Sequence, residues 1–370
     1  MMEQKRLGDI ATYINGFSFK PEDRSTVGLP IIRIQDLTGN TYDLGFYDGS
    51  YPKRIEINDG DVLISWSASL GIYVWNRGKA LLNQHIFKVA FDKCDVNREF
   101  FVYAVRHKLK EMESKTHGAT MKHIVKKDFD NTLIPFPTLN EQGKIAKLLD
   151  TVDTIISARQ QQLQKLDELV KARFVEMFGD PVSNSRGLPE ATLPELGEFG
   201  RGVSKHRPRN DPKLLGGKYP LIQTGDVASA DLYITSYTGT YSDLGLAQSK
   251  MWDEGTLCIT IAANIAKTAI LGFDACFPDS VVGFRANEKT NNIYIHYWFS
   301  FFQRILEAQA PESAQKNINL KSLSELRVIY PTKEEQDAFA AFVAEVDKSK
   351  LMFQKLHQQL NILQQKAGDI

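Results

Sequence analysis

No residue pattern typical of an enzyme active site occurs in the 370-residue sequence. An adenine methyltransferase needs an Asn/Asp-Pro-Pro-aromatic loop to hold its flipped base, and the chain has no Pro-Pro pair. A phosphate-binding P-loop needs GxxxxGK followed by Ser or Thr, whereas Tyr219 follows Gly216-Gly217-Lys218. The seven histidines and three cysteines lack the spacing of metal ligands. These absences predict a chain with no catalytic residues, no metal site and no cofactor of its own.

Side chains suited to hydrogen bonding with base edges follow several predicted strands. Arg pairs well with guanine, and Asn or Gln with adenine. The base-reading candidates are Arg33, Gln35, Trp66, Ser67, Ser69, Gln84, His85, Gln223, Thr224 and Asn264. Asp36 and Asp226 are instead expected to organise turns. For Gln84 and its neighbour Asn83, a buried hydrogen-bonding role is the alternative.

Basic residues are balanced by acidic ones over the whole chain. Lys+Arg and Asp+Glu each number 45, so the net charge is zero. Only local basic patches could then attract nucleic acid. The candidates for phosphate contacts are Lys122, Lys126, Lys127, Arg201, Lys205, Arg207, Arg209, Lys316 and Lys321. Each of them is alternatively an ordinary solvated surface residue.

The elements that carry these residues occur twice. Pro-Thr-x-x-Glu-Gln at Pro137–Gln142 recurs 194 residues later at Pro331–Gln336, and a Val-Asp pair follows each copy at the same distance. Further segments match in the same order at offsets between 190 and 195: GLPIIRIQDL (28–37) with GKYPLIQTGDV (217–227), DGDVLISWSASLG (59–71) with DEGTLCITIAANIA (253–266), and GATMKHIVKKDF (118–129) with ESAQKNINLKSL (312–323). Matches in a constant order indicate a tandem duplication.

Each half combines short strands with helices, which predicts an α+β fold. Runs of β-branched residues between Gly, Pro, Asn and Asp indicate strands. A long helix without proline then closes each half. The expected boundaries are a first globular domain at 1–138, a central helix at 139–179, a second globular domain at 180–332 and a C-terminal helix at 333–370.

Both long helices carry an apolar stripe in a seven-residue frame. Two such helices can bury their stripes against each other as an antiparallel coiled coil; the alternative is that each packs only on its own domain. Arg159 and Gln162 interrupt the first stripe, where they could fix the register or face a partner. The stripe residues expected in the spacer or at a partner docking surface are Ile145, Leu148, Val152, Leu166, Leu169, Phe342, Val346, Phe353 and Leu360.

The two similar halves and the helix pair suggest a reader of two-part DNA sites. Each helix would be roughly 50 Å long at about 1.5 Å per residue, and dimeric DNA readers place half-sites about 34 Å apart. Because the halves differ in sequence, the half-sites need not match.

The chain resembles the specificity (S) subunits of type I restriction–modification systems. The resemblance covers essentially the whole chain and rests on GDVLISWSASLG, LLNQHIFKV (81–89), GATMKHIVKKDF, IPFPTLNEQGKIAKLLDTVD and LDELVKARFVEMFGD (166–180). The second half departs from it at Asp337-Ala338-Phe339, which replaces Gly143-Lys144-Ile145, and lacks the Ser-Ala-Ser of the first half. The resemblance implies two target recognition domains in tandem, separated by two long helices in an antiparallel coiled coil with a pseudo-two-fold repeat.

The resemblance also implies the partners. They are double-stranded DNA, two methyltransferase subunits that use S-adenosylmethionine, and restriction subunits that use ATP. The chain itself would be non-catalytic.

Two other interpretations remain open at the level of the sequence. The chain could serve a methyltransferase–nuclease fusion, or it could be a duplicated scaffold that does not bind DNA. No run of about 18 apolar residues marks a membrane span, and MMEQKRLGDI has no signal core, so the chain is expected to be cytoplasmic.

Overall fold

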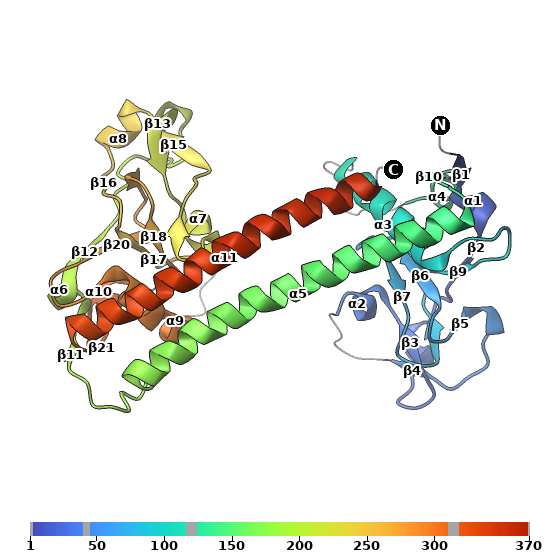
Figure 1. Ribbon diagram of the computed structural model, residues 1–370, viewed down its shortest axis with the longest axis horizontal. Coiled ribbons are helices and arrows are strands. Elements are labelled where there is room, and N and C mark those ends of the chain that lie inside the picture. The colour runs from blue at the N-terminus through green and yellow to red at the C-terminus, as the bar shows by residue number, and fades with distance from the viewer. Residues whose placement is uncertain (1–2, 40–44, 116–123, 310–317, 369–370) are drawn as a thin grey trace. The chain divides into compact units, whose positions relative to one another are not determined.

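A computed structural model describes residues 3–39, 45–115, 124–309 and 318–368 (Figure 1). The chain divides into two compact units. Unit 1 comprises residues 1–160 and 354–370, and unit 2 comprises residues 161–353. The long helices expected at 139–179 and 333–370 are α5 (Leu139–Phe178) and α11 (Lys333–Gly368), and the division falls within both of them. Among the described residues, no helix is long and apolar enough to cross a membrane.

Unit 1 is built from short strands and a few helices. They are β1 (Gln4–Arg6), α1 (Leu7–Ile10), β2 (Thr12–Asn15), β3 (Leu29–Ile32), α2 (Ile34–Leu37), β4 (Phe46–Tyr47), β5 (Glu56–Ile57), β6 (Val62–Ser65), β7 (Gly71–Val74), β8 (Ala80–Leu82), β9 (Ile86–Ala90), α3 (Arg98–Lys115), α4 (Lys126–Asp130), β10 (Leu133–Pro135) and the first part of α5. Their sheets have the strand orders β1-β10, β2-β9-β6-β7 and β4-β3-β8-β5.

Unit 2 has nearly the same series of elements. They are the last part of α5, β11 (Glu190–Ala191), α6 (Leu193–Leu196), β12 (Gly197–Arg201), β13 (Leu215–Leu221), α7 (Thr224–Ser229), β14 (Tyr233–Ile234), β15 (Gly239–Tyr241), α8 (Asp243–Ala247), β16 (Met251–Trp252), β17 (Leu257–Thr260), β18 (Thr268–Leu271), β19 (Ala275–Cys276), β20 (Val281–Ala286), α9 (Asn292–Gln309), α10 (Leu320–Ser324), β21 (Val328–Ile329) and most of α11.

The sheets confirm the duplication. Unit 2 has the strand orders β11-β21, β12-β20-β17-β18-β14 and β15-β13-β19-β16. Each matches a sheet of unit 1 strand for strand, except that β14 adds one strand beside β18. The predicted α+β class with an internal repeat is therefore correct, and both units have buried apolar cores between sheets and helices.

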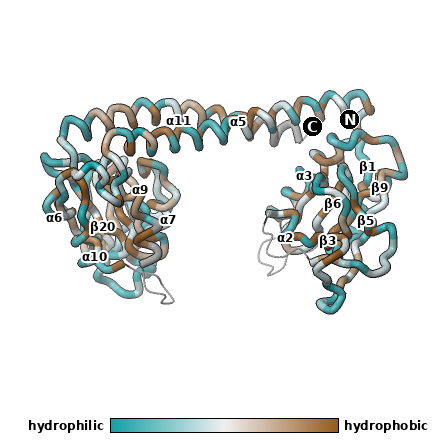
Figure 2. The backbone as a smooth tube through the Cα atoms, turned by 90° about the horizontal axis from the view of Figure 1, so that it is seen from below, coloured by the Kyte–Doolittle hydropathy of each residue, from teal (hydrophilic) through white to brown (hydrophobic). Residues whose placement is uncertain are grey.

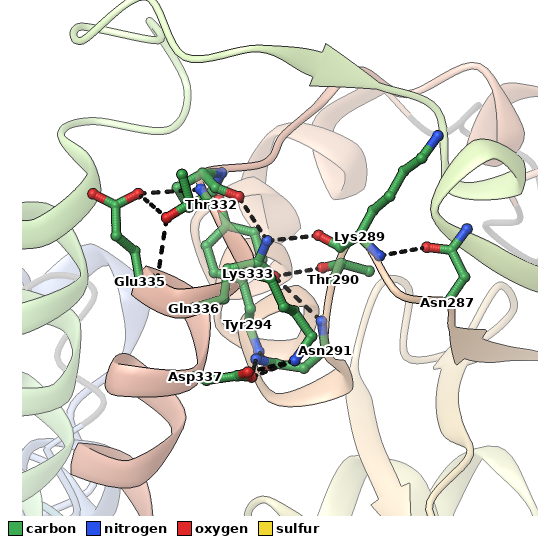
Figure 3. Close-up of polar contacts among 11 residues, drawn as sticks. Asn287, Lys289, Thr290, Asn291, Tyr294, Thr332, Lys333, Glu335, Gln336 and Asp337 are labelled. Atoms are coloured by element: carbon green, nitrogen blue, oxygen red, sulfur yellow. Dashed lines mark hydrogen bonds and ion pairs between the residues drawn. The ribbon is translucent and has the colours of Figure 1, made fainter.

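The repeated Pro-Thr-x-x-Glu-Gln motif forms the start of each long helix. Thr138 and Glu141 cap α5 reciprocally: the Thr138 backbone N–H donates to the Glu141 carboxylate at 3.0 Å, and the Glu141 N–H donates to the Thr138 hydroxyl at 3.4 Å. The Thr138 hydroxyl also donates to the Glu141 carboxylate at 2.7 Å, and this hydrogen bond, together with the one from the Thr138 N–H, lowers the pKa of Glu141. Thr332 and Glu335 make the same capping box at the start of α11 (Figure 3).

The glutamine of this motif links the long helix to the preceding domain by hydrogen bonds. The side chains of Gln142 and Gln336 are fully buried. Gln142 accepts a hydrogen bond from the Asn97 N–H at 2.9 Å, just before α3. Gln336 accepts from the Thr290 hydroxyl at 2.7 Å and from the Asn291 N–H at 3.2 Å, just before α9 (Figure 3).

Within unit 2, α5 and α11 pack antiparallel. Phe174 and Phe178 of α5 both contact the ring of Phe339 near the start of α11. Further along, the ammonium of Lys350 pairs with Asp167. Residue numbers fall along one helix as they rise along the other, so the contacts confirm the antiparallel coiled coil here.

The apolar stripe is distributed over more than one face of the long helices. Figure 2 shows apolar and polar residues alternating along α5 and α11. Val346 is buried, and Leu166 and Phe342 pack against the core of unit 2. Leu148 and Leu169 are 59% and 48% exposed, so both lie outside the buried seam. The other stripe residues are partly buried: Ile145, Val152, Phe353 and Leu360.

Candidate nucleic-acid interface

Most of the base-reading candidates in unit 1 meet at one edge. Strands β3 and β8 are parallel neighbours, with Ile32 opposite Leu82. Their carboxyl ends therefore lie side by side, and the segments that follow them come together. Strand β6 ends at the same edge, because Ser65 pairs with Ile86 at the start of β9.

These segments enclose what we call the carboxyl-end cleft, with a volume of about 340 Å³. Its lining consists of Arg33, Ile34, Gln35, Thr38, Ala68, Ser69, Asn83, Gln84 and His85. Five of the base-reading candidates of unit 1 are in this lining. Gln35, Ser69, Gln84 and His85 are exposed there, and Arg33 is partly buried.

Backbone hydrogen bonds fix the walls of the carboxyl-end cleft. The Asn83 N–H donates to the Ile32 carbonyl at 3.1 Å, and the Gln84 N–H donates to the Phe17 carbonyl at 2.9 Å. The side chain of Gln84 stays exposed while its backbone is held. A glutamine in this setting can offer a donor and an acceptor to a base edge. Because its backbone is already held, only its side chain loses conformational freedom on binding.

A buried hydroxyl holds the loop between β6 and β7. Ser65 donates to the carbonyls of Ser69 and Gly71, at 2.5 and 3.4 Å. Ala68, at the turn of this loop, has φ +59°, which is uncommon for a residue with a side chain. Thr260 and Ala263 repeat the arrangement in unit 2, where the Thr260 hydroxyl donates to the Asn264 carbonyl and Ala263 has φ +62°.

Asp36 and Asp226 organise turns, as expected from the sequence. Asp36 is buried and accepts the Arg33 N–H at 2.8 Å at the start of α2. Asp226 accepts the Gln223 N–H at 2.8 Å at the start of α7. Both carboxylates thereby fix the backbone beside candidate base readers.

Trp66 and Ser67 lie behind the carboxyl-end cleft. The indole of Trp66 stacks on Phe87, with ring centroids 5.6 Å apart, and packs against the core of unit 1. Ser67 is only 6% exposed. The prediction that both are exposed base readers is therefore wrong, because the sequence shows where the loop lies but not which of its side chains face inward.

The equivalent edge of unit 2 brings together a different set of side chains. Leu221 of β13 pairs in parallel with Cys276 of β19, so Gln223 and Thr224 lie beside the segment between β19 and β20. The Ile261 N–H donates to the Ser280 carbonyl at 3.0 Å, which adds the loop carrying Asn264. Gln223 and Asn264 are exposed, and Thr224 is partly buried.

Two of the predicted phosphate contacts also lie at this edge of unit 2. Arg207 and Arg209 both pair with Asp279, between β19 and β20, and Arg207 lies 3.4 Å from it. Their side chains remain 55% and 47% exposed, so both guanidinium groups can donate further hydrogen bonds. Asp279 therefore holds this basic loop in place. The sequence did not indicate these ion pairs.

The remaining basic candidates are exposed or lie outside the described residues. A hydrogen bond of 3.0 Å from the Ile124 N–H to the Trp66 carbonyl brings the segment of Lys126 and Lys127 to the edge of unit 1. Lys126 pairs with Asp130 at 2.8 Å. The others that the structure describes are exposed: Lys127, Arg201, Lys205 and Lys321. Lys122 and Lys316 lie outside the described residues.

Comparisons with known proteins agree on one family. The model of the type I restriction modification DNA specificity domain matches residues 1–168 and 190–362. The specificity subunit of the type I restriction enzyme EcoBI from Escherichia coli is 24% identical over 365 residues, which cover 89% of this chain and 76% of the relative. The putative MjaX specificity subunit from Methanocaldococcus jannaschii is 23% identical, over 93% of this chain and 86% of the relative.

Solved structures share the fold. A chain from a study of complex assembly and conformational transition in the type I R-M system aligns with a TM-score of 0.60 at 18% identity, over 99% of this chain and 96% of that one. The type I S subunit from M. genitalium aligns with a TM-score of 0.54 at 14% identity, over 100% of this chain and 95% of that one.

Proposed function

The chain belongs to the family of type I restriction modification DNA specificity domains, which makes it a DNA specificity subunit, and we propose that it recognises a two-part DNA site without catalysis of its own. Each unit would contact one part of the site through the edge where β3, β6 and β8, or their counterparts β13, β17 and β19, end. The observation that carries this proposal is the convergence of Arg33, Gln35, Ser69, Gln84 and His85 on the carboxyl-end cleft.

The two parts of the site would differ in sequence. At equivalent positions, unit 1 has Ser69 where unit 2 has Asn264. The position of Gln84 in unit 1 is occupied in unit 2 by Asp279, which holds Arg207 and Arg209. Hydroxyl, amide and guanidinium groups prefer different base edges. The duplicated fold thus supports an asymmetric target.

The basic residues near each edge would contact phosphates. Such contacts position a protein on DNA without specifying sequence. Arg207 and Arg209 suit this role in unit 2, because Asp279 holds them in place while leaving both exposed. In unit 1, Lys126 and Lys127 at the start of α4 would have this role.

Exposed apolar residues on α5 would dock the partners. Leu148 and Ile155 are seven residues apart and are 59% and 38% exposed, so they lie on one helix face that is available to another helix. We propose two methyltransferase subunits as the occupants of such faces, with restriction subunits joining them. S-adenosylmethionine and ATP would be used by those partners, in the cytoplasm.

Binding to DNA at several salt concentrations tests the proposal. The chain, co-purified with the methyltransferase from the adjacent gene, is mixed with a labelled random-sequence duplex. We expect the logarithm of the association constant to fall linearly with the logarithm of the KCl concentration, because phosphate contacts release counterions. The slope should decrease by about one for each phosphate contact removed, as in Arg209→Ala. Affinity that is absent, or that does not change with salt, would support the scaffold interpretation instead.

A further inference from the structure

Phe17 is an exposed aromatic residue beside the carboxyl-end cleft, and the sequence did not indicate it as a DNA contact. It follows β2 and is 41% exposed. The polar side chains of the cleft suit the hydrogen-bond donors and acceptors of the bases. An aromatic ring instead suits an apolar group, and in the major groove the C5 methyl of thymine is such a group.

Backbone hydrogen bonds hold Phe17 beside the end of β8. The Phe17 N–H donates to the Leu82 carbonyl at 2.8 Å, and the Phe17 carbonyl accepts the Gln84 N–H at 2.9 Å. Phe17 and Asn83 are therefore partners in a parallel bridge, and such partners direct their side chains to the same face. Because Asn83 lines the carboxyl-end cleft, Phe17 lies at the same edge of unit 1.

Gly16 permits this close approach of the two segments. Its N–H donates to the Ile86 carbonyl at 3.1 Å. A Cβ atom at this position would lie 1.9 Å from the Asn83 carbonyl oxygen, so any side chain would force the segments apart. The position of Phe17 is thus determined by backbone contacts on both sides of it.

Two further aromatic rings support the ring of Phe17. Phe17 and Phe19 meet edge to face with their centroids 5.0 Å apart, and Phe19 meets Tyr47 in the same way at 5.1 Å. Phe19 is only 8% exposed, so it connects Phe17 to the core of unit 1. A ring that is ordered before binding loses less conformational freedom when it meets a ligand.

The equivalent position in unit 2 has a different residue. The Gly202 N–H donates to the Val281 carbonyl at 2.9 Å, which repeats the contact of Gly16. The next residue, Val203, therefore corresponds to Phe17, and it is partly buried. A function of the exposed ring would thus belong to unit 1 and to one part of the DNA site.

We propose that Phe17 contacts the C5 methyl of a thymine within one base pair of the base that Gln84 reads. This inference rests on the proposed function, because it names one base contact of the DNA site. The amide of Gln84 suits adenine N6 and N7, and an A·T pair presents the thymine methyl in the same groove. One hydrogen bond joins the backbones of Phe17 and Gln84, and successive base pairs are about 3.4 Å apart. The two side chains would therefore reach the same or neighbouring base pairs.

Replacing thymine with deoxyuridine tests this contact, because the two bases differ only in the C5 methyl. The probe is a duplex that carries the two-part motif found by methylation mapping, with each thymine replaced in turn. The chain, co-purified with its methyltransferase, is titrated with each duplex. We expect one replacement, within one base pair of the position where Gln84→Ala relaxes discrimination, to weaken binding about fourfold, the effect of burying one methyl group.

Variants of Phe17 assign this effect to the ring. Phe17→Ala should bind the thymine and deoxyuridine duplexes equally, whereas Phe17→Leu should retain most of the preference, because leucine is also apolar. Tyr237→Ala is the matched control. Tyr237 is 46% exposed and packs on Phe273 with ring centroids 5.3 Å apart, but it lies in unit 2, so the fourfold preference should persist. Melting curves establish that the variants are folded, and the comparison of duplexes with the wild-type chain needs no variant.

The outcomes separate this inference from the proposed function. Sequence-specific binding without any such deoxyuridine effect would overturn the thymine contact and leave the proposed function intact. The contact is also overturned if Phe17→Ala keeps the preference for thymine, or if it weakens both duplexes equally without abolishing that preference. A motif with no A·T pair in the part that depends on Gln84 would contradict it as well. If the complex binds no DNA sequence specifically, the proposed function and this inference both fail.

Discussion

The buried glutamines Gln142 and Gln336 show how single residues join a helix to its domain. In each, the amide oxygen is a hydrogen-bond acceptor and the amide nitrogen is a donor. Gln142 donates to the Pro137 carbonyl at 2.8 Å, and Gln336 donates to the Pro331 carbonyl at 2.9 Å. A shorter or apolar side chain would leave these backbone groups buried without partners. The Pro-Thr-x-x-Glu-Gln motif therefore recurs because it attaches each long helix to the domain that precedes it.

Replacing Gln336 with alanine should lower the free energy of unfolding of unit 2 by at least about 2 kcal/mol, because several buried polar groups lose their partners. Chemical denaturation of the full chain measures this change. Gln164→Ala is the matched control, since the hydrogen bond of 2.9 Å that Gln164 donates to Glu168 is exposed. An equal loss in the two variants would show that the buried amide has no special role.

His296 should make unit 2 sensitive to acid. Burial lowers the pKa of His296 to about 4, and the charge of Lys350 acts in the same direction. The unfolded histidine has a pKa of about 6.5. Between about pH 6.5 and pH 4 the unfolded chain thus binds a proton that the folded chain does not. Stability should fall by up to about 3 kcal/mol as the pH decreases through this range.

The difference between wild type and His296→Gln isolates this contribution. Glutamine can still pair with the Thr268 hydroxyl, which lies 2.9 Å from the histidine Nδ1, but it does not titrate. Unfolding free energies measured from pH 7 to pH 4 should fall less in the variant. Parallel profiles would show that His296 binds its proton equally in both states.

Gln84 is the residue in the carboxyl-end cleft whose geometry best suits base reading, because its backbone is held and its amide is exposed. Gln84→Ala should cost about 1–3 kcal/mol of discrimination at one base pair. Competition between duplexes that differ at single positions measures it. The change should be confined to one part of the site, whereas Gln164→Ala should leave both parts unaltered. Uniform weakening over all sequences would instead indicate a phosphate contact.

At the scale of elements, neighbouring residues of α5 have different environments. Leu149 is 4% exposed and Leu148 is 59% exposed. The heptad frame places both on the stripe, but it does not tell which residue the domain buries. One face of α5 therefore stabilises the fold, while the other is available to a partner.

Leu148→Glu should reduce co-purification of the methyltransferase without lowering the melting temperature of the free chain. Leu149→Ala should instead destabilise the free chain by about 2–5 kcal/mol through the cavity that it creates. Pull-down from a co-expressing strain and thermal denaturation measure the two effects. If Leu148→Glu leaves co-purification intact, this face of α5 does not bind the methyltransferase.

Much of the fold could be predicted from sequence because it is repeated. Strands, helix starts and turn aspartates recur with their spacing, and two copies make a weak local signal recognisable. Strand β14 was not predicted, because two residues, Tyr233 and Ile234, form no recognisable pattern without the neighbouring edge. The carboxyl-end cleft was predicted only as separate loops, since the parallel pairing of β3 with β8 brings them together. The inward positions of Trp66 and Ser67 likewise depend on tertiary packing.

At the scale of the whole molecule, duplication followed by divergence gives one chain two similar units with different surface residues. The sheets and helix attachments remain equivalent, whereas the residues at the carboxyl ends of the strands differ. Such a division keeps the scaffold constant and lets each recognition surface change separately. A specificity subunit for an asymmetric DNA site needs this combination.

The most direct test is to map DNA methylation that depends on this chain. The chain is co-expressed with the methyltransferase from the adjacent gene in a methylation-free host, and N6-methyladenine is mapped by single-molecule sequencing. We predict a single two-part motif with an unread gap, present only when this chain is present. No methylation, with a methyltransferase that is active beside another specificity subunit, would contradict the assignment and favour a scaffold that does not read DNA.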